Sequence, residues 1–425
     1  MEQRVVDILL IDVDNSYLTC FFNKLFCFCR RYWYQLRVVN LQQEGRPSRE
    51  EMCVEIQGRA NLKDVIDQLL TAAVTDGVTP GAVAGVAVVS KKYERKSCIC
   101  SSGFTTRERT RTKVTAKTVY DLASLTKPLV TVLCTLHLVE RKVLTLDMVL
   151  SDLLPFSTVP DDKKNIQLRQ LLGHCSGFPA HRPYFIEALA VKKGGRKDFF
   201  LQSILDEPLE YSPGKMNIYS DLGFILLGYI IEQKTGKSLE QFHRKNILEP
   251  LGLQNHFWFT PSVEKRNIDH CAATEICPWT EKPLCGVVHD DNCRVMGGMA
   301  GHAGLFGTVE GVLQMGQFMV EVWNGWRTTE LFSRELLKLF LTRFPGSTWT
   351  CGFDTPSAEN SSSGRYFGPA SIGHLGFTGC SIWIDLARGC VVVLLTNRVN
   401  PSRKNIKIRQ FRPLYHDAVM KHLCL

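Results

Sequence analysis

The sequence predicts an α/β (α+β) fold in which one antiparallel sheet is built from both ends of the chain, with flanking helices and an inserted helical domain. Three observations support this prediction. Strand-forming runs lie at residues 81–103 and 371–396, helical periodicity dominates between them, and an amphipathic helix from Ile406 to His422 closes the chain. A helical insertion between strands of one sheet leaves a cleft at the junction, and we expect the functional residues there.

The first predicted elements are a helix and a hairpin. Apolar residues recur at helical spacing from Leu62 to Ala73, and the turn residues from Gly77 to Pro80 end that helix. The small and β-branched run Gly81–Ser90 predicts a strand that is buried on both faces. Ser97–Gly103 predicts its hairpin partner.

The middle of the chain is predicted to be helical. Apolar residues follow a helical period from Ala123 to Arg141, and we expect Leu144–Leu153 to continue as a second helix or a turn. Ser220–Lys234 opens with residues typical of a helix cap and stops before a glycine. Leu239–Leu251 predicts a further helix.

Strand character returns only near the end of the chain, in Ser371–Gly376, Cys380–Asp385 and Cys390–Thr396. We therefore expect one domain over residues 59–422, with a helical subdomain at roughly 123–310 inserted in the α/β part. Residues 1–58 are an N-terminal extension to which the sequence assigns no role.

The composition fits a globular protein with a large core. Of 425 residues, 44% are hydrophobic and 22% are charged, which is too apolar for a disordered chain. The net charge of +9 is modest, and the basic clusters at residues 107–113 and 192–197 lack interleaved aromatic residues, so we expect no nucleic-acid partner. No apolar run is long enough to span a bilayer. Residues 17–36, apolar but interrupted by charges, suit at most a weak contact with a membrane surface.

Sixteen cysteines are scattered along the chain, and no signal-peptide pattern precedes them. We therefore expect reduced thiols and a cytoplasmic location. No cysteine pair has zinc-ligand spacing, and we expect neither a metal nor an organic cofactor. Side-chain hydrogen bonds, rather than a metal ion, are expected to hold the polar loop that contains His289, Asp290, Asp291, Cys293 and His302.

The sharpest chemical signal is Ser124-Leu125-Thr126-Lys127. At the start of a helix, a spacing of three puts the side chains of Ser124 and Lys127 on one face. Pro128 is tolerated only in the first turn of a helix, so the helix begins close to Ser124. There the helix dipole favours an alkoxide, and a desolvated lysine can lose its proton and act as a general base. Taken alone, the motif leaves open a helix cap followed by a solvated lysine.

Two further elements carry residues suited to the same chemistry. Tyr219 precedes Ser220 and Asp221 at the mouth of a predicted helix, and a phenol beside a lysine ammonium can relay a proton to a leaving group. Residues 373–379, GHLGFTG, place glycines in strand-forming sequence, where a ligand can approach a bare strand edge. Free N–H groups on such an edge can hold a peptide-like substrate and complete an oxyanion hole.

These three elements, in this order, resemble the serine β-lactamase and penicillin-binding protein superfamily. The resemblance covers roughly residues 62–422, including the stretches at 171–184, 287–308 and 373–385. It is closest to the class C β-lactamase-like branch, which includes D,D-peptidases and family VIII esterases. Enzymes of this branch commonly work on cell-wall peptides outside the cytoplasm, so the cell envelope or periplasm is the alternative location.

The resemblance implies a role for each matching residue. Ser124 would be the acylated nucleophile, Lys127 its base and Tyr219 the proton relay. His374 stands where many relatives have the lysine of the third motif, as it does in other members of this branch. The backbone amides of Ser124 and Phe377 would form the oxyanion hole. The residues expected to contact the substrate are Asp221, Leu375 and Gly376.

Two of these positions depart from the family pattern. Leu375 stands where many relatives have a hydroxyl that binds the substrate carboxylate, and leucine cannot donate that hydrogen bond. Asp221 replaces asparagine, and its charge is expected to hold the Lys127 proton more tightly unless the carboxylate is engaged elsewhere.

The expected activity is that of a serine hydrolase that forms an acyl-enzyme on Ser124. Its expected partners are small-molecule or peptide substrates that contain an amide or ester bond, such as a β-lactam or a D-alanyl peptide. Two alternatives remain: an esterase of the same fold that acts on small esters, which Leu375 favours, and a binding or scaffold module without turnover.

Overall fold

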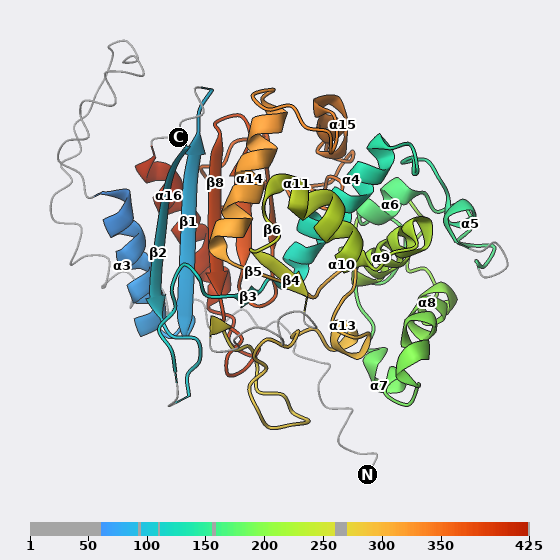
Figure 1. Ribbon diagram of the computed structural model, residues 1–425, viewed down its shortest axis with the longest axis horizontal. Helices are drawn as coiled ribbons and strands as arrows, with labels where there is room; N and C mark the ends of the chain where they lie inside the picture. Colours follow the sequence, from blue (N-terminus) through green and yellow to red (C-terminus); the bar gives the residue numbers. More distant parts are fainter. Residues whose placement is uncertain (1–60, 92–94, 109–110, 155–158, 260–269, 424–425) are drawn as a thin grey trace. The chain divides into compact units, whose positions relative to one another are not determined.

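A five-stranded antiparallel sheet in the order β2-β1-β8-β7-β6 forms the α/β part of the chain (Figure 1). Its strands are β1 (Gly81–Val89), β2 (Arg95–Gly103), β6 (Ser371–Leu375), β7 (Ser381–Asp385) and β8 (Cys390–Thr396). β1 from the first part of the chain pairs with β8 from the last part. The prediction that both chain ends build one sheet is therefore confirmed.

The computed structural model describes residues 61–91, 95–108, 111–154, 159–259 and 270–423. The predicted N-terminal extension at 1–58, with its membrane-contact segment at 17–36, lies outside the described residues.

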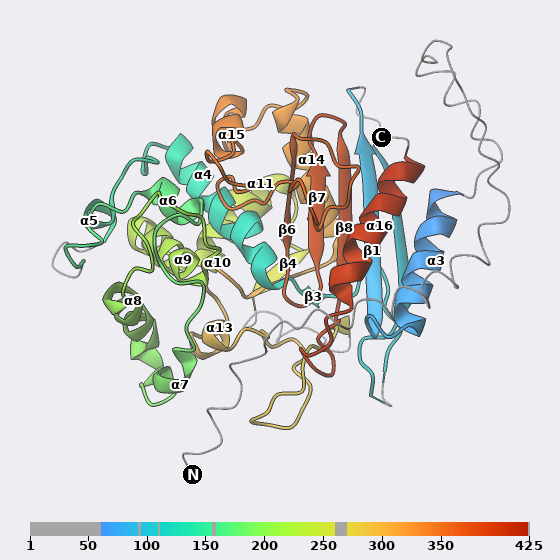
Figure 2. The same ribbon diagram turned by 180° about the vertical axis from the view of Figure 1, so that it is seen from behind.

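Helices cover both faces of the sheet (Figures 1 and 2). α3 (Leu62–Thr75) and α16 (Ile408–His422), both predicted, lie on one face, and α14 (Val309–Trp323) lies on the other. Successive side chains of a strand point to opposite faces, so Val86 packs in the core with α3 and α16 while Ala87 packs in the core that contains α14. Burial on both faces explains why β1 and β8 read as continuous apolar runs.

The helical region lies beside the edge strand β6. Its helices are α4 (Leu133–Glu140), α5 (Leu150–Leu153), α6 (Leu168–Leu172), α7 (Phe185–Ala188), α8 (Arg196–Asp206), α9 (Asp221–Thr235), α10 (Leu239–His243), α11 (Glu249–Leu251), α13 (Asp291–Val295) and α15 (Arg334–Phe340). The central helix, α9, is apolar around most of its circumference and is buried accordingly. It begins at the predicted cap, where the Ser220 hydroxyl accepts a hydrogen bond from Gly223 N–H, and ends at Gly236 with φ 63°.

Of two sequence predictions for the middle of the chain, one holds in part and the other was wrong. The first, a second helix or a turn over Leu144–Leu153, holds in part: residues 146–147 form a turn and Leu150–Leu153 is helical, while Val149 forms a β-bridge with Gln167. Strands also occur far from the chain ends. A three-stranded sheet in the order β3-β5-β4 is built from β3 (Tyr120–Asp121), β5 (Leu305–Gly307) and β4 (Phe257–Phe259). Two or three residues are too few to show the alternation that identifies a strand in sequence.

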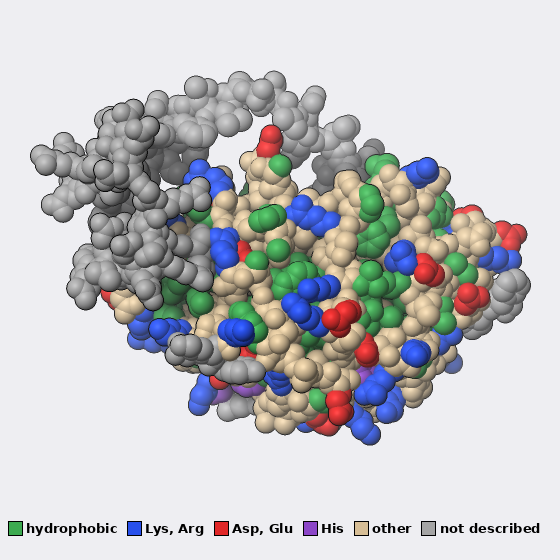
Figure 3. All heavy atoms as spheres, turned by 90° about the horizontal axis from the view of Figure 1, so that it is seen from above, with side chains coloured by type: hydrophobic (Ala, Val, Ile, Leu, Met, Phe, Trp, Pro, Cys, Tyr) green, Lys and Arg blue, Asp and Glu red, His purple; other side chains and the backbone are tan. Residues whose placement is uncertain are grey.

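The described surface and core agree with the composition. On the face seen from above, Lys and Arg side chains are scattered among hydrophobic and acidic ones (Figure 3). No helix within the described residues is both long and apolar enough to cross a membrane. The eleven cysteines in the described ranges are free thiols, most of them buried.

Candidate active site

The small sheet places Ser124. β3 ends at Asp121, and Leu122 N–H donates to the Leu305 carbonyl of β5, so the chain enters the next turn from a fixed position. Ser124 then lies in a short 3₁₀ helix at Ala123–Leu125. Ala123 has φ 48°, a left-handed conformation that is costly for a residue with a Cβ, and its N–H donates to the Asp121 carboxylate at 2.8 Å. Backbone strain of this kind is concentrated at functional sites.

A π-helical turn continues the segment and carries the lysine. It spans Lys127–Val132, with Pro128 in its first turn as the sequence predicts, and leads into α4. π-Helical turns are frequent at functional sites. The Nζ atom of Lys127 lies 3.2 Å from Ser124 Oγ. The spacing of three residues therefore brings the two side chains into hydrogen-bond contact.

The Lys127 side chain is fully buried and surrounded by acceptors. Besides Ser124 Oγ, its Nζ donates to Asp221 Oδ1 at 2.7 Å and to the His302 carbonyl at 3.2 Å. Burial by itself lowers the pKa of Lys127, but the charges and hydrogen bonds of Asp221 and Tyr219 together outweigh it, and the net pKa is raised. The same ion pair lowers the pKa of Asp221 against the effect of its burial. The direct contact with the Asp221 carboxylate therefore opposes the effect of desolvation on the Lys127 proton.

The aromatic ring of Tyr219 lies against the Lys127 ammonium. The Lys127 Nζ lies 4.7 Å from the centre of the Tyr219 ring, a cation–π distance. The ring also packs against His174, at 4.7 Å, and Trp349, at 5.4 Å, between ring centroids. Burial raises the pKa of Tyr219, and the positive charge of Lys127 opposes part of that rise. Tyr219 is therefore a neutral phenol that can donate a proton.

His174 supports this arrangement as a structural residue. Its Nδ1 accepts a hydrogen bond from Ser220 N–H at 3.1 Å, immediately after Tyr219. Burial lowers the pKa of His174 well below its usual value, so the ring is neutral. No sequence motif pointed to His174, and its hydrogen bond fixes the start of α9.

The end of β6 forms the opposite wall. β6 is an edge strand, and within the described ranges Asp354 bridges its open side at Gly373 alone. Beyond it, Thr378 Oγ1 donates to the Asp121 carbonyl at 2.7 Å, which ties the strand end to the Ser124 segment. Gly376 lies so close to that segment that a Cβ there would be 2.7 Å from the Leu122 carbonyl oxygen. Because a Cβ at position 376 would clash with this carbonyl, the close approach of the two segments requires glycine.

Phe377, the expected second oxyanion donor, is held through its carbonyl. Arg398 donates two hydrogen bonds to the Phe377 carbonyl oxygen, at 2.9 and 2.6 Å, and its guanidinium lies over the Phe377 ring. The ring also stacks on His289 with centroids 5.4 Å apart and remains 49% exposed. The peptide group of Phe377, on the wall opposite Ser124, therefore has a fixed orientation.

His374 lies in the site as a neutral ring. Its Nδ1 contacts the Leu375 carbonyl at 2.9 Å, and its Nε2 is buried without a hydrogen-bond partner among the described residues. Burial and the charge of Lys127 lower the pKa of His374 to about 3. His374 therefore cannot supply the positive charge of the lysine that relatives have at this position.

Two cavities meet at Ser124. Both are lined by Ser124, Tyr219 and Phe377. The first, of about 360 Å³, also carries His181, Asp221, His289, Asp290, Asp291 and Arg403. The second, of about 340 Å³, also carries Trp349, Asp354, His374, Leu375, Gly376, Arg398, Arg409 and Arg412. The predicted site residues other than the buried Lys127 thus line one or both of two compartments on either side of the serine.

Several lining residues were not found by sequence reasoning. His181 contacts Asp221 with Nδ1 at 3.4 Å from Oδ2. Arg398 and Arg412 donate to backbone carbonyls beside the site. Arg409 and Trp349 also line the second cavity. Isolated Arg, His and Trp residues give no motif, and only the fold brings them together.

The polar loop is held as expected. His302 Nε2 contacts Asp290 Oδ1 at 2.9 Å, and His289 Nε2 contacts Glu275 Oε2 at 3.1 Å. No group of three or more His, Cys, Asp or Glu side chains in the described ranges is arranged to hold a metal ion.

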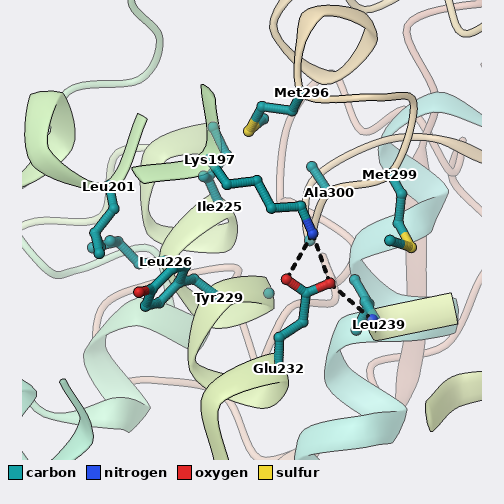
Figure 4. A pocket seen from close by; sticks show the side chains of 12 residues that line it. Lys197, Leu201, Ile225, Leu226, Tyr229, Glu232, Leu239, Met296, Met299 and Ala300 are labelled. Atoms are coloured by element: carbon teal, nitrogen blue, oxygen red, sulfur yellow. Dashed lines mark hydrogen bonds and ion pairs between the residues drawn. The ribbon is translucent and has the colours of Figure 1, made fainter. Parts of the chain in front are cut away.

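A further cavity behind α9 is structural. The Lys197 ammonium and the Glu232 carboxylate form an ion pair there, among apolar side chains that include Met296 and Met299 (Figure 4). Its volume of about 30 Å³ suits roughly one water molecule. This space is too small for a substrate.

Comparisons with known proteins agree with this geometry. The family model described as "Beta-lactamase" matches residues 66–415. A protein from Escherichia coli O157:H7, described as "Putative D-alanyl-D-alanine carboxypeptidase", is 33% identical over 311 residues, which cover 67% of this chain and 70% of the relative.

Two solved structures share the fold. The octameric penicillin-binding protein homologue from Pyrococcus abyssi has a TM-score of 0.63 at 21% identity, covering 84% of this chain and 76% of its own. EstCE1, a hydrolase with promiscuous acyltransferase activity, has a TM-score of 0.66 at 22% identity, covering 84% of this chain and 98% of its own. With a family model that spans most of the sequence, the chain belongs to the beta-lactamase family and is a serine hydrolase.

Proposed function

We propose that the chain hydrolyses an amide or ester bond through an acyl-enzyme on Ser124, and that its substrate is a peptide ending in a D-alanyl carboxylate. One observation carries the proposal: the Lys127 Nζ is 3.2 Å from Ser124 Oγ in a cleft that Tyr219 also lines. A nucleophile in contact with a basic side chain, with a proton donor beside it, is the arrangement that acyl transfer needs.

In this mechanism Ser124 Oγ attacks the substrate carbonyl carbon, and its proton passes to the Lys127 amine. The carbonyl oxygen becomes an oxyanion, and the backbone N–H groups of Ser124 and Phe377 stabilise it. Tyr219 gives its proton to the leaving nitrogen or oxygen as the scissile bond breaks, and the Lys127 proton restores the phenol. Water then attacks the acyl-enzyme, which releases the acid and regenerates Ser124.

The second cavity supports a carboxylate on the leaving group. Leu375 offers no hydroxyl there, but Arg398, Arg409 and Arg412 give the cavity a strong positive charge. Guanidinium groups bind carboxylates through charge-assisted hydrogen bonds. The 33% identical relatives, described as D-alanyl-D-alanine carboxypeptidases, favour the same substrate class. A small neutral ester is the second candidate, because Leu375 and Phe377 give the wall beside Ser124 an apolar surface.

The test is intact-protein mass spectrometry after exposure to a penicillin, a p-nitrophenyl ester and a peptide ending in D-Ala-D-Ala. We expect an adduct of the acyl group on the wild type and none on Ser124→Ala. Ser101→Ala, an exposed serine on β2, serves as the control and is expected to acylate normally. An adduct on Ser124→Ala would refute the assigned nucleophile. A folded wild type that forms no adduct with any of the three substrates would support the scaffold alternative.

A further inference from the structure

Asp221 is shared between two basic side chains. One carboxylate oxygen lies 2.7 Å from Lys127 Nζ, and the other lies 3.4 Å from His181 Nδ1. Lys127 is fully buried, whereas the His181 side chain is 46% exposed in the cavity that reaches Ser124. Lys127 thus connects to the solvent-filled cavity through one carboxylate and one imidazole.

The hydrogen bonds of Lys127 show which proton its ammonium must lose before it can act as a base. Two acceptors, Asp221 Oδ1 and the His302 carbonyl, fix two of its N–H groups, and the third direction points at Ser124 Oγ. A neutral amine held in this way would present its lone pair to the Ser124 hydroxyl. The resting ammonium carries a third proton in that direction, so it has one proton too many to act as a base.

We propose that His181 is a positioning residue for acylation: its protonated form draws the Asp221 carboxylate toward itself and weakens the hold of that carboxylate on the Lys127 ammonium. The inference rests on the proposed acyl-enzyme mechanism. The ammonium then passes its proton to the Ser124 hydroxyl, which lines the cavity, as that hydroxyl gives its own proton to water, and the resulting amine accepts the Ser124 proton during attack. Asp221 stays ionised throughout, as a carboxylate that two cations share.

The other acidic side chains near His181 have partners of their own and do not replace its contact with Asp221. His181 also faces Asp290 at the cap of α13 and Asp291 in its first turn. Asp290 is engaged by His302 and by Cys293 N–H. Asp291 pairs with Arg294 and lies 3.5 Å from Arg403.

The groups around His181 shift its pKa. The hydrogen bond to Asp221 raises the pKa of His181, burial opposes the rise, and the net pKa lies above its usual value. The Asp221 contact therefore favours the protonated form of His181.

This coupling predicts a distinctive pH profile for the acylation rate. A base that must lose a proton gives a rate that rises tenfold per pH unit. As His181 loses its proton, Asp221 attracts the Lys127 ammonium more strongly and the pKa of Lys127 increases. Over this interval the rise of the acylation rate with pH therefore flattens into a shoulder. Once His181 is neutral, the acylation rate rises with pH again. If the two groups interact by about one pKa unit, the protonated form of His181 accelerates acylation about tenfold.

The experiment compares two substitutions over the range from about pH 5 to about pH 8, where a histidine titrates. In His181→Gln the shoulder should vanish, with acylation about tenfold slower than the wild type at the acidic end and equal to it at the alkaline end. In His181→Lys, which keeps a permanent cation, the acidic rate should be retained and the alkaline rate should exceed the wild type by about tenfold. His270→Gln, an exposed histidine, is the matched control and should follow the wild-type profile.

The outcomes separate the two proposals. A His181→Gln profile parallel to the wild type, or a His181→Lys variant that behaves like His181→Gln, would overturn the role of His181 and leave the acyl-enzyme mechanism intact. Absence of any acyl adduct on the wild type across the pH range would overturn the mechanism itself.

Discussion

At the scale of single residues, the site is dominated by the buried ion pair of Lys127 and Asp221. The folded protein raises the pKa of Lys127 and lowers the pKa of Asp221. The contribution of Lys127 to stability is therefore complete below its unfolded pKa of about 10.5 and is lost as pH rises through its higher folded pKa. The contribution of Asp221 is complete above about pH 4 and is lost as pH falls through its lower folded pKa. Between these limits the pair stabilises the fold.

Replacing Asp221 by asparagine should destabilise the protein in a pH-dependent way. Removal of one partner leaves an uncompensated buried charge, so we expect a loss of about 3 kcal/mol at neutral pH. The loss should shrink at about pH 3, because the Asp221 carboxylate of the unfolded wild type begins to bind a proton there while the folded one, with its lowered pKa, stays ionised. Urea unfolding at the two pH values measures the difference. Asp67→Asn breaks an exposed pair with Lys63 and should cost less than about 1 kcal/mol at either pH; an equally small effect at Asp221 would contradict the buried-pair assignment.

At the scale of elements, the site depends on two sheets that meet at one short segment. The small sheet leads the chain into Ser124 through β3, and the large sheet contributes the end of β6, which Thr378 ties to the Asp121 carbonyl. Neither sheet alone positions both backbone amides of the proposed oxyanion hole. The contact between Gly376 and the Leu122 carbonyl is where the two meet.

Gly376→Ala should therefore damage acylation strongly. The added Cβ would be 2.7 Å from the Leu122 carbonyl oxygen, a backbone atom that cannot move without shifting Ser124. Since loss of one oxyanion donor costs about 100-fold or more in rate, we expect a fall of about 100-fold in the acylation rate constant, measured by stopped flow with a chromogenic substrate. Gly194→Ala, where a Cβ would meet nothing within 4 Å, is the control. Unchanged acylation in Gly376→Ala would show that the two segments are not rigidly coupled.

At the scale of the whole molecule, the cleft gathers residues from the entire described chain. The second cavity takes Ser124 and Tyr219 from the helical region, His374 from β6 and Arg409 from α16. α16 also packs with α3 on the face of the large sheet (Figure 2). Substrate selection is therefore expected to depend on a helix that lies almost 300 residues from the nucleophile, as the numbering of Ser124 and Arg409 shows.

Arg409→Gln tests the proposed carboxylate recognition. Arg409 is exposed at the cavity wall, whereas Arg398 and Arg412 are held by backbone carbonyls. We expect kcat/KM for a peptide ending in a free D-Ala carboxylate to fall about fivefold, roughly the 1 kcal/mol of a partly exposed ion pair. The same peptide with a C-terminal amide should be unaffected, and Arg141→Gln, remote from this cavity, should leave both values unchanged. Equal losses for the two peptides would indicate that the carboxylate does not bind at Arg409.

The sequence by itself determined the large sheet, the helices α3, α9 and α16, and the pairing of Ser124 with Lys127. These features depend on local patterns: continuous apolar runs for buried strands, caps for helices and a three-residue spacing for two side chains on one face. The three residues of β4 and the two of β3 carry no such pattern, and their pairing with β5 was decided by tertiary packing.

The electrostatic environment of the site depends on tertiary contacts. The sequence showed an aspartate at position 221 but not that its two oxygens face Lys127 and His181. Electrostatic interaction in a buried site depends on distance and on excluded water, and both are set by segments far apart in the chain. The residues proposed to react can be read from the sequence, whereas the electrostatic interactions around them exist only once the chain is folded.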